Sequence, residues 1–285
     1  NNLRTRKYLL HIEEIFRGNA NQASITLEDL FKFTIPLPPL PEQTAIAAAL
    51  SDVDQLLTSL DQLIAKKRDI KRAAMQQLLS GKQRLPGFGG KWNEKRLRDL
   101  CRSIVDGTHF TPRYVREGIP FYSVESVTRD DFSNTKFISL EEHLELIKRC
   151  KPEKGDILMT RIGSVGDTKL IDWDVNASIY VSLALLEVGS AVDSGYLYAY
   201  SKSRLFIKDV ESRSLMNAAP KKINMKEIGD VLINTPPTLE EQRAIAKILL
   251  DLASELKVLE QKREKTKLLK QGMMQELLTG RIRLV

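Results

Sequence analysis

One long segment of this chain occurs twice, and that duplication restricts the possible folds more than any other feature. Residues 41–86 align without gaps to residues 240–285, with 19 of 46 positions identical. Unrelated segments of this length would share about three. A weaker match extends upstream, where residues 25–39 correspond to residues 223–237 in their apolar positions and paired prolines. The repeated unit is therefore a domain end, a proline-rich boundary and a long segment of regular pattern.

Each copy of the long segment has the pattern of a helix. Pro41 and Glu42 suit a first turn, because proline lacks an N–H that would be unpaired there and an acidic group favours the helix dipole. Gly81 and Gly280 follow at the place of a glycine C-cap. A helix over residues 42–80 would be about 58 Å long.

Apolar residues along both segments alternate in steps of four and three, which is the spacing of a coiled coil. A bundle core or a single amphipathic helix shows the same stripe, but two related helices of equal length most simply pack on each other. We therefore expect an antiparallel pair. The residues expected in its seam are Ile46, Leu50, Val53, Leu57, Leu60, Ile245, Leu249, Leu252, Leu256 and Leu259.

The segment between the two helices has the pattern of one complete mixed domain, and residues 1–40 resemble only the end of such a domain. The expected fold class is α+β, with a mixed α/β domain and two long helices forming an antiparallel coiled coil. The expected parts are 1–40, 41–90, 91–238 and 239–285. Within the complete domain, strands are predicted at 121–127, 156–160, 169–172 and 179–186, and helices at 140–150 and 195–210.

The charge of the chain is uneven. It carries 44 basic and 37 acidic residues, a net charge of +7, yet residues 91–235 have 22 basic and 21 acidic groups, or 22 − 21 = +1. A basic protein suggests a nucleic-acid partner. Because residues 91–235 are almost neutral, local loops or other subunits would have to supply most contacts to DNA phosphates. The longest uncharged stretch, Val175–Leu186, is 12 residues, too short for the roughly 20 of a membrane helix. Two cysteines form no disulfide framework, which fits a cytoplasmic protein.

We find no pattern of catalytic or metal-binding residues in the sequence. Asn234–Pro237 is similar to the Asn/Asp-Pro-Pro-aromatic motif of adenine methyltransferases, but Thr235 interrupts it and no aromatic residue follows. Gly87–Lys91 lacks the first glycine and the final Ser/Thr of a phosphate loop. The sequence therefore favours a non-enzyme without a metal or cofactor of its own.

Three loops carry side chains suited to DNA, in which Arg and Asn are the usual partners of guanine and adenine. They are 106–114, the turn after residue 160, and 213–222. Each of these residues could equally be a solvated loop side chain, and His109 could make a structural hydrogen bond. The candidates are Thr108, His109, Arg113, Tyr114, Arg161, Ser164, Arg213, Asn217, Lys221 and Lys222.

The order of motifs resembles the specificity subunit of type I restriction–modification systems. The resemblance rests on Trp92, on residues 151–166 and 214–237, and on the P-P-x(2–3)-E-Q-x-x-I-A start of both helices. It implies a non-catalytic subunit in which each of two target-recognition domains reads half of a bipartite sequence in double-stranded DNA. It also implies modification (methyltransferase) and restriction (translocase–nuclease) subunits as partners, which would hold S-adenosylmethionine and ATP with Mg²⁺.

The first recognition domain departs from the family pattern, because only its last 35 residues are present. A longer chain could supply the rest, or a natural half-subunit could restore two readers by dimerising. Two other hypotheses stay open: a structural adaptor that reads no DNA, and a self-contained modification enzyme.

Overall fold

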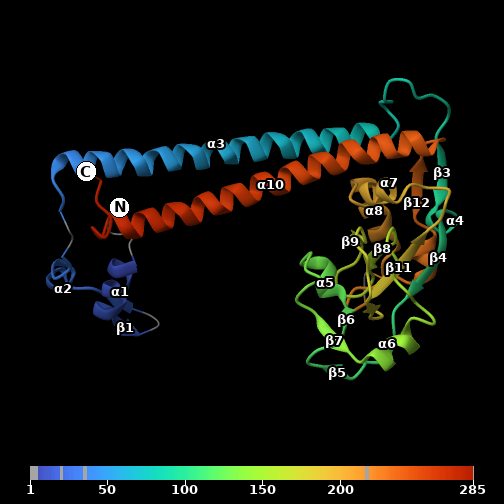
Figure 1. Ribbon diagram of the computed structural model, residues 1–285, viewed down its shortest axis with the longest axis horizontal. Coiled ribbons are helices and arrows are strands. Elements are labelled where there is room, and N and C mark those ends of the chain that lie inside the picture. The colour runs from blue at the N-terminus through green and yellow to red at the C-terminus, as the bar shows by residue number, and fades with distance from the viewer. Residues whose placement is uncertain (1–5, 20–21, 35–36, 216–217, 285) are drawn as a thin grey trace. The chain divides into compact units, whose positions relative to one another are not determined.

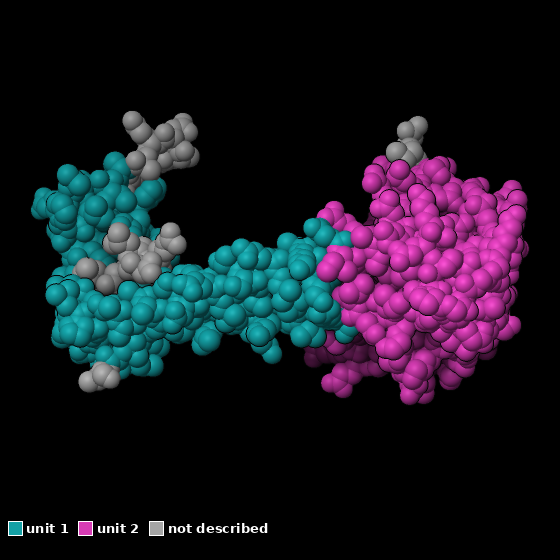
Figure 2. Space-filling view, turned by 90° about the horizontal axis from the view of Figure 1, so that it is seen from above, with its two compact units in different colours: residues 1–69, 254–285 teal, residues 70–253 magenta. Residues whose placement is uncertain are grey.

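The computed structural model describes residues 6–19, 22–34, 37–215 and 218–284. Within them the chain divides into two compact units, one formed by residues 1–69 and 254–285 and the other by residues 70–253 (Figure 2). Both long helices contribute to both units. None of the helices in this described part is long and apolar enough to span a membrane.

The first unit contains a small N-terminal subdomain and parts of the two long helices (Figure 1). The side chain of Thr26 accepts a hydrogen bond from the backbone N–H of Asp29 at 3.1 Å and so caps the second short helix. Its elements are α1 (Arg6–Ile15), β1 (Arg17–Asn19), β2 (Gln22–Ser24), α2 (Leu27–Phe31), the first part of α3 (Leu40–Leu78) and the last part of α10 (Leu239–Leu277).

Helices α3 and α10 are each 39 residues long and run antiparallel within the first unit. Their direction follows from ion pairs in which the residue number rises along one helix as it falls along the other: Asp54–Lys270, Asp61–Arg263 and Lys67–Glu255. Such exposed pairs contribute little stability but are consistent with one register. The expectation of an α+β fold with two antiparallel long helices is confirmed.

The expected seam residues differ in burial. Leu60 and Leu256 are 5% and 7% exposed, whereas Leu57 and Leu259 are half-buried. Val53 and Leu252 are also half-buried. The remaining four, Ile46, Leu50, Ile245 and Leu249, are buried near the helix ends, where Ile46 and Leu50 pack with Leu277 and the other two belong to the core of the second unit.

The second unit is a mixed domain with two four-stranded sheets and a two-stranded ribbon. The antiparallel sheet has the order β4-β11-β8-β9, the mixed sheet β10-β6-β7-β5, and the ribbon β12-β3. The strands are β3 (Asn93–Arg96), β4 (Cys101–Asp106), β5 (Tyr114–Val115), β6 (Ile119–Tyr122), β7 (Lys136–Ile138), β8 (Ile157–Thr160), β9 (Thr168–Leu170), β10 (Ser178–Ile179), β11 (Leu183–Val188) and β12 (Leu232–Thr235). The helices are α4 (Leu97–Leu100), α5 (Val124–Thr128), α6 (Leu140–Leu146), α7 (Ser194–Ser201), α8 (Arg204–Arg213) and α9 (Met225–Gly229), together with the remaining parts of α3 and α10.

Several predicted elements of this unit were wrong in detail, among them the helix expected at 140–150, which ends at Leu146. The strand expected at 121–127 ends at Tyr122, because Ser123 and Ser126 form a capping box that starts α5. The helix expected at 195–210 is two helices, since Ser203 caps the start of α8. The strand expected at 179–186 is split between β10 and β11, which belong to different sheets.

Candidate nucleic-acid interface

Two of the predicted recognition loops leave the same edge of the antiparallel sheet. Strand β11 lies between β4 and β8 and runs antiparallel to both, so the carboxyl ends of β4 and β8 meet at its start. The register places Ala184 opposite Asp106 and Leu183 opposite Thr160. The loop after β4 and the turn after β8 are neighbours for this reason.

The carboxylate of Asp106 connects these loops. Asp106 is only 5% exposed and accepts hydrogen bonds from Arg161 at 2.9 Å and Arg149 at 2.6 Å, while the Nε2 of His109 lies 2.9 Å from it. One buried acid thus holds three side chains that lie up to 55 residues from it in the sequence. An ionised carboxylate at low exposure requires such partners.

The third loop joins the same cluster through its backbone. The N–H of Gly163 donates to the carbonyl of Lys221 at 2.8 Å, and the N–H of Ile223 donates to the carbonyl of Arg161 at 3.0 Å. Within the loop, the N–H of Leu215 donates to the carbonyl of Lys222 at 2.8 Å. The structure therefore brings all three predicted loops to one place in the second unit.

The ten predicted residues occupy different environments in this cluster. His109, Arg113, Tyr114, Ser164 and Lys222 are exposed, and Arg213 and Lys221 are half-buried. Arg213 pairs with Asp209 at 2.8 Å, and the hydroxyl of Ser164 donates to Asp167. Asn217 lies outside the described residues.

Arg161 and Thr108, two of the predicted DNA-binding residues, are buried. Arg161 is 9% exposed, and its guanidinium donates to Asp106 and to the carbonyls of Val181 and Ile223. Thr108 is 7% exposed, and its backbone bridges to Tyr180. Both residues hold the loops in place.

Sequence reasoning missed Arg149, which is exposed beside the loop after β4. It was predicted to lie in a helix over 140–150, but α6 ends at Leu146. The 43 residues between Asp106 and Arg149 explain why no local pattern pointed to their ion pair.

A hollow of about 500 Å³ lies beside the cluster. Tyr114 from the first loop and Ile162 from the second line it, and the Nζ of Lys136 lies 4.4 Å from the centre of the Tyr114 ring. Stacking rings and basic groups of this kind suit sugar, phosphate and base edges. The other lining residues are Phe121, Ser123, Val124, Glu125, Ser126, Arg129, Asp131, Asn134, Thr135, Lys136, Tyr180 and Ser182.

The two cysteines of the chain are buried or half-buried. Burial raises the pKa of the Cys101 and Cys150 thiols to about 12, so both are protonated at neutral pH and poor nucleophiles. Among the side chains that the structure describes, no group of three His, Cys, Asp or Glu residues could hold a metal ion. What the loops present is a set of hydrogen-bond donors and cations.

A family model matches most of the chain. The profile described as "Type I restriction modification DNA specificity domain" matches residues 4–69 and 89–268. The chain belongs to this type I specificity family. The resemblance drawn from the motifs is therefore confirmed, and each matched segment contains one copy of the domain end and most of one long helix.

Curated relatives are longer than this chain. The putative type I restriction enzyme MjaX specificity subunit of Methanocaldococcus jannaschii is 26% identical over 287 residues, which cover 94% of this chain and 64% of the relative. The type I restriction enzyme EcoBI specificity subunit of Escherichia coli is 25% identical over 260 residues, covering 80% of this chain and 54% of the relative. The chain thus spans less than two thirds of the length of these type I specificity subunits.

Solved type I structures share the fold. The S subunit of a type I restriction–modification system from M. genitalium aligns with a TM-score of 0.66 at 20% identity, over 96% of this chain and 70% of that one. A chain from a structure of type I complex assembly and conformational transition aligns with a TM-score of 0.60 at 22% identity, over 98% of this chain and 70% of that one.

Proposed function

We propose that this chain is the DNA-recognition subunit of a type I restriction–modification complex. The observation that carries the proposal is the convergence of three loops at one sheet edge, where His109, Arg113, Tyr114 and Lys222 are exposed. Family membership supports double-stranded DNA as the ligand of that surface. The domain at 91–238 reads one half of a bipartite target, and a second recognition domain reads the other.

The chain contributes recognition and assembly, and the chemistry belongs to its partners. Modification subunits, which bind S-adenosylmethionine, dock on the long helices, and restriction subunits, which bind ATP with Mg²⁺, join the assembly. The near-neutral charge of residues 91–235, 22 − 21 = +1, supports this division, because little counterion release is available to the lone domain. Tight binding therefore requires the modification subunits.

Affinity for the methylated target should depend on the exposed loop cations. Arg113→Ala and Lys222→Ala, each assembled with the modification subunits, should weaken target binding by about 1–3 kcal/mol without changing the thermal midpoint. Lys154→Ala is the matched control. Lys154 is an exposed cation that precedes the start of β8, whereas the candidate loop follows the end of that strand. The measurement is a binding titration on target and scrambled duplexes at two salt concentrations.

Equal affinity of wild type and both loop variants for the target would contradict the proposal. A complex that binds target and scrambled duplexes alike would show the chain to be an adaptor that reads no DNA.

A further inference from the structure

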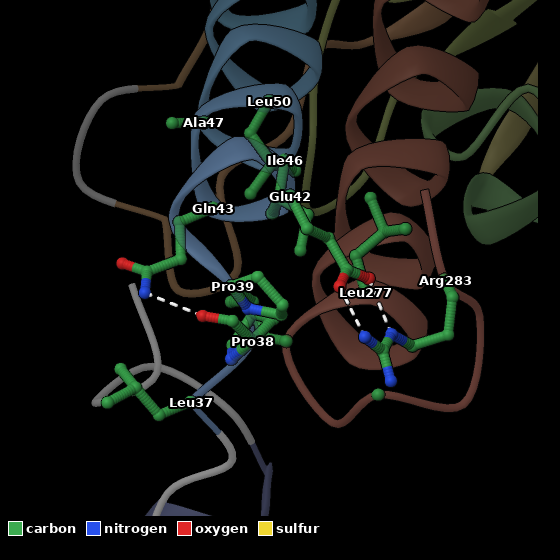
Figure 3. A pocket seen from close by; sticks show the side chains of 12 residues that line it. Leu37, Pro38, Pro39, Glu42, Gln43, Ile46, Ala47, Leu50, Leu277 and Arg283 are labelled. Carbon is green, nitrogen blue, oxygen red and sulfur yellow. Dashed lines mark hydrogen bonds and ion pairs between the residues drawn. The ribbon is translucent and has the colours of Figure 1, made fainter. Parts of the chain in front are cut away.

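A pocket of about 480 Å³ in the first unit, between the start of α3 and the end of α10, shows that a cation at a surface can be satisfied within the chain (Figure 3). The guanidinium of Arg283 donates to both carboxylate oxygens of Glu42, at 2.6 and 2.5 Å. Exposed cations alone therefore do not identify a ligand. A large apolar side chain that a firmly held loop keeps in contact with water is a stronger indication.

Phe110 is such a side chain. It lies in the loop that follows β4, one of the three loops that converge in the second unit, and it is 58% exposed. Tyr114, in the same loop, is 38% exposed and lines the hollow beside the cluster. The loop thus presents two aromatic rings among its donors and cations.

The backbone on the N-terminal side of Phe110 is fixed by hydrogen bonds to a neighbouring segment. The N–H of Thr108 donates to the carbonyl of Ile179 at 3.1 Å, and the N–H of Val181 donates to the carbonyl of Thr108 at 3.0 Å. Gly107 permits this close approach, because a Cβ there would lie 2.0 Å from the carbonyl oxygen of Ile179. The Thr108 hydroxyl also lies 3.4 Å from the backbone N and from the carbonyl oxygen of Phe110.

The backbone on the other side of Phe110 is held as well. Pro112 is buried, and the N–H of Arg113 donates to the carboxylate of Glu142 at 3.3 Å. A loop held on both sides loses little conformational entropy when it binds, whereas an apolar ring in water gains free energy when it is covered. The Phe110 ring is therefore placed to be covered by a ligand.

The edge of a DNA base pair offers this ring one kind of apolar partner. In the major groove the paired bases present hydrogen-bond donors and acceptors, and the apolar group among them is the C5-methyl group of thymine. His109 and Arg113, on either side of Phe110 in the loop, are exposed and suit polar base edges and phosphates. An aromatic ring between such donors complements a thymine methyl group.

We propose that Phe110 reads the 5-methyl group of a thymine in the half-site bound by residues 91–238. The inference rests on the proposed function, because it assigns one base contact within DNA recognition. Phe110 was not among the residues named from the sequence, which were chosen for their polar side chains.

Replacement of thymidine by deoxyuridine tests the contact, because it removes the methyl group and leaves the hydrogen-bonding groups of the base pair unchanged. The chain, assembled with the modification subunits, is titrated with its target duplex and with duplexes that carry one replacement at a time. In the wild type, one replacement in this half-site should weaken binding by about threefold to fivefold, the effect of losing one buried methyl contact. In Phe110→Ala the same replacement should have no measurable effect, and Phe110→Leu, which keeps an apolar side chain, should retain part of it.

Replacements in the spacer are the control on the DNA, and Leu205→Ala is the control on the protein. Leu205 is 46% exposed at the start of α8, so this variant loses an exposed apolar side chain outside the three loops. It should keep the dependence of the wild type on the methyl group. Because Phe110 and Leu205 are both exposed, neither alanine variant should change the thermal midpoint.

Two results would overturn the proposal while leaving DNA recognition intact. One is a wild-type complex that prefers its target to a scrambled duplex but binds every deoxyuridine duplex as tightly as the thymidine duplex. The other is a Phe110→Ala complex with weaker binding but the same dependence on the methyl group as the wild type, since the ring would then contact DNA in another way. A wild-type complex without preference for its target would contradict the proposed function itself, and this inference with it.

Discussion

Asp106 determines how the recognition loops are held, although it carries none of the donors expected to read DNA. Its carboxylate is buried and binds Arg161, whose remaining donors go to backbone carbonyls. Arg161 is therefore a structural cation, and the exposed Arg113 and Lys222 are the side chains left to face a ligand.

Removing the charge of Asp106 should be costly. Asp106→Asn leaves Arg161 buried without its counterion, and breaking a buried pair in this way costs about 3–5 kcal/mol. Glu145→Gln, which removes the carboxylate of an exposed pair with Lys148, should cost less than about 1 kcal/mol. The free energies of unfolding from denaturant titrations test this, and equal losses in the two variants would contradict the role of Asp106.

His143 should make stability depend on pH. Burial lowers its pKa below the ordinary value of 6.5, and its Nδ1 lies 2.9 Å from the Ser178 hydroxyl. On acidification the unfolded state therefore binds a proton at a higher pH than the folded state does. The stability of the fold is full above about pH 6.5 and falls as the pH drops through the pKa of His143 in the folded state. Wild type should therefore lose more stability than His143→Gln between about pH 7.5 and 5.5. Equal losses of stability in wild type and His143→Gln over this pH range would contradict the prediction.

Among the elements, those defined by periodicity and duplication could be predicted, and those defined by tertiary contacts could not. The long helices follow from a repeated apolar stripe. The division of 195–210 at Ser203 and the end of the strand at Tyr122 depend on serine residues that cap the start of a helix. The apolar pattern of these segments does not reveal such caps. The three loops proposed to read DNA could be named from the sequence because they lie between predicted elements, whereas the burial of Arg161 depends on an acid 55 residues away.

The helix pair should depend on a few buried positions. Leu60→Ala should destabilise the chain by about 2–5 kcal/mol, because Leu60 is 5% exposed and truncation leaves a cavity. Leu56→Ala, at a residue one turn earlier that is 43% exposed, should cost less than about 1 kcal/mol. Denaturant unfolding monitored by helical circular dichroism compares the two, and similar costs would show that α10 does not cover Leu60.

For the chain as a whole, the central feature is the pair of repeat-related helices, each 39 residues long. Asp61 pairs with Arg263, so the points after Gln62 and after Lys262 face each other. Because the ion pairs are consistent with one register, an insertion in one helix alone would misalign the seam, whereas matched insertions would lengthen the pair.

Matched insertions of four helix-forming residues at these two points should lengthen the DNA spacer. Each adds about one turn, or ~6 Å, which corresponds to about two base pairs. Sequencing of methylated sites, with a complete pair of recognition domains present, measures the spacer. An active variant with an unchanged spacer would show that the helices do not set this distance.

The most direct test of the recognition role is a genome-wide map of methylated sites made by the assembled complex. Wild type is compared with the combined variant Arg113→Ala, Tyr114→Ala and Lys222→Ala, whose changes fall on exposed loop residues. We predict that one half-site becomes degenerate while the other half-site and the spacer stay the same. An unchanged bipartite sequence in the variant would contradict the conclusion that these loops read the DNA.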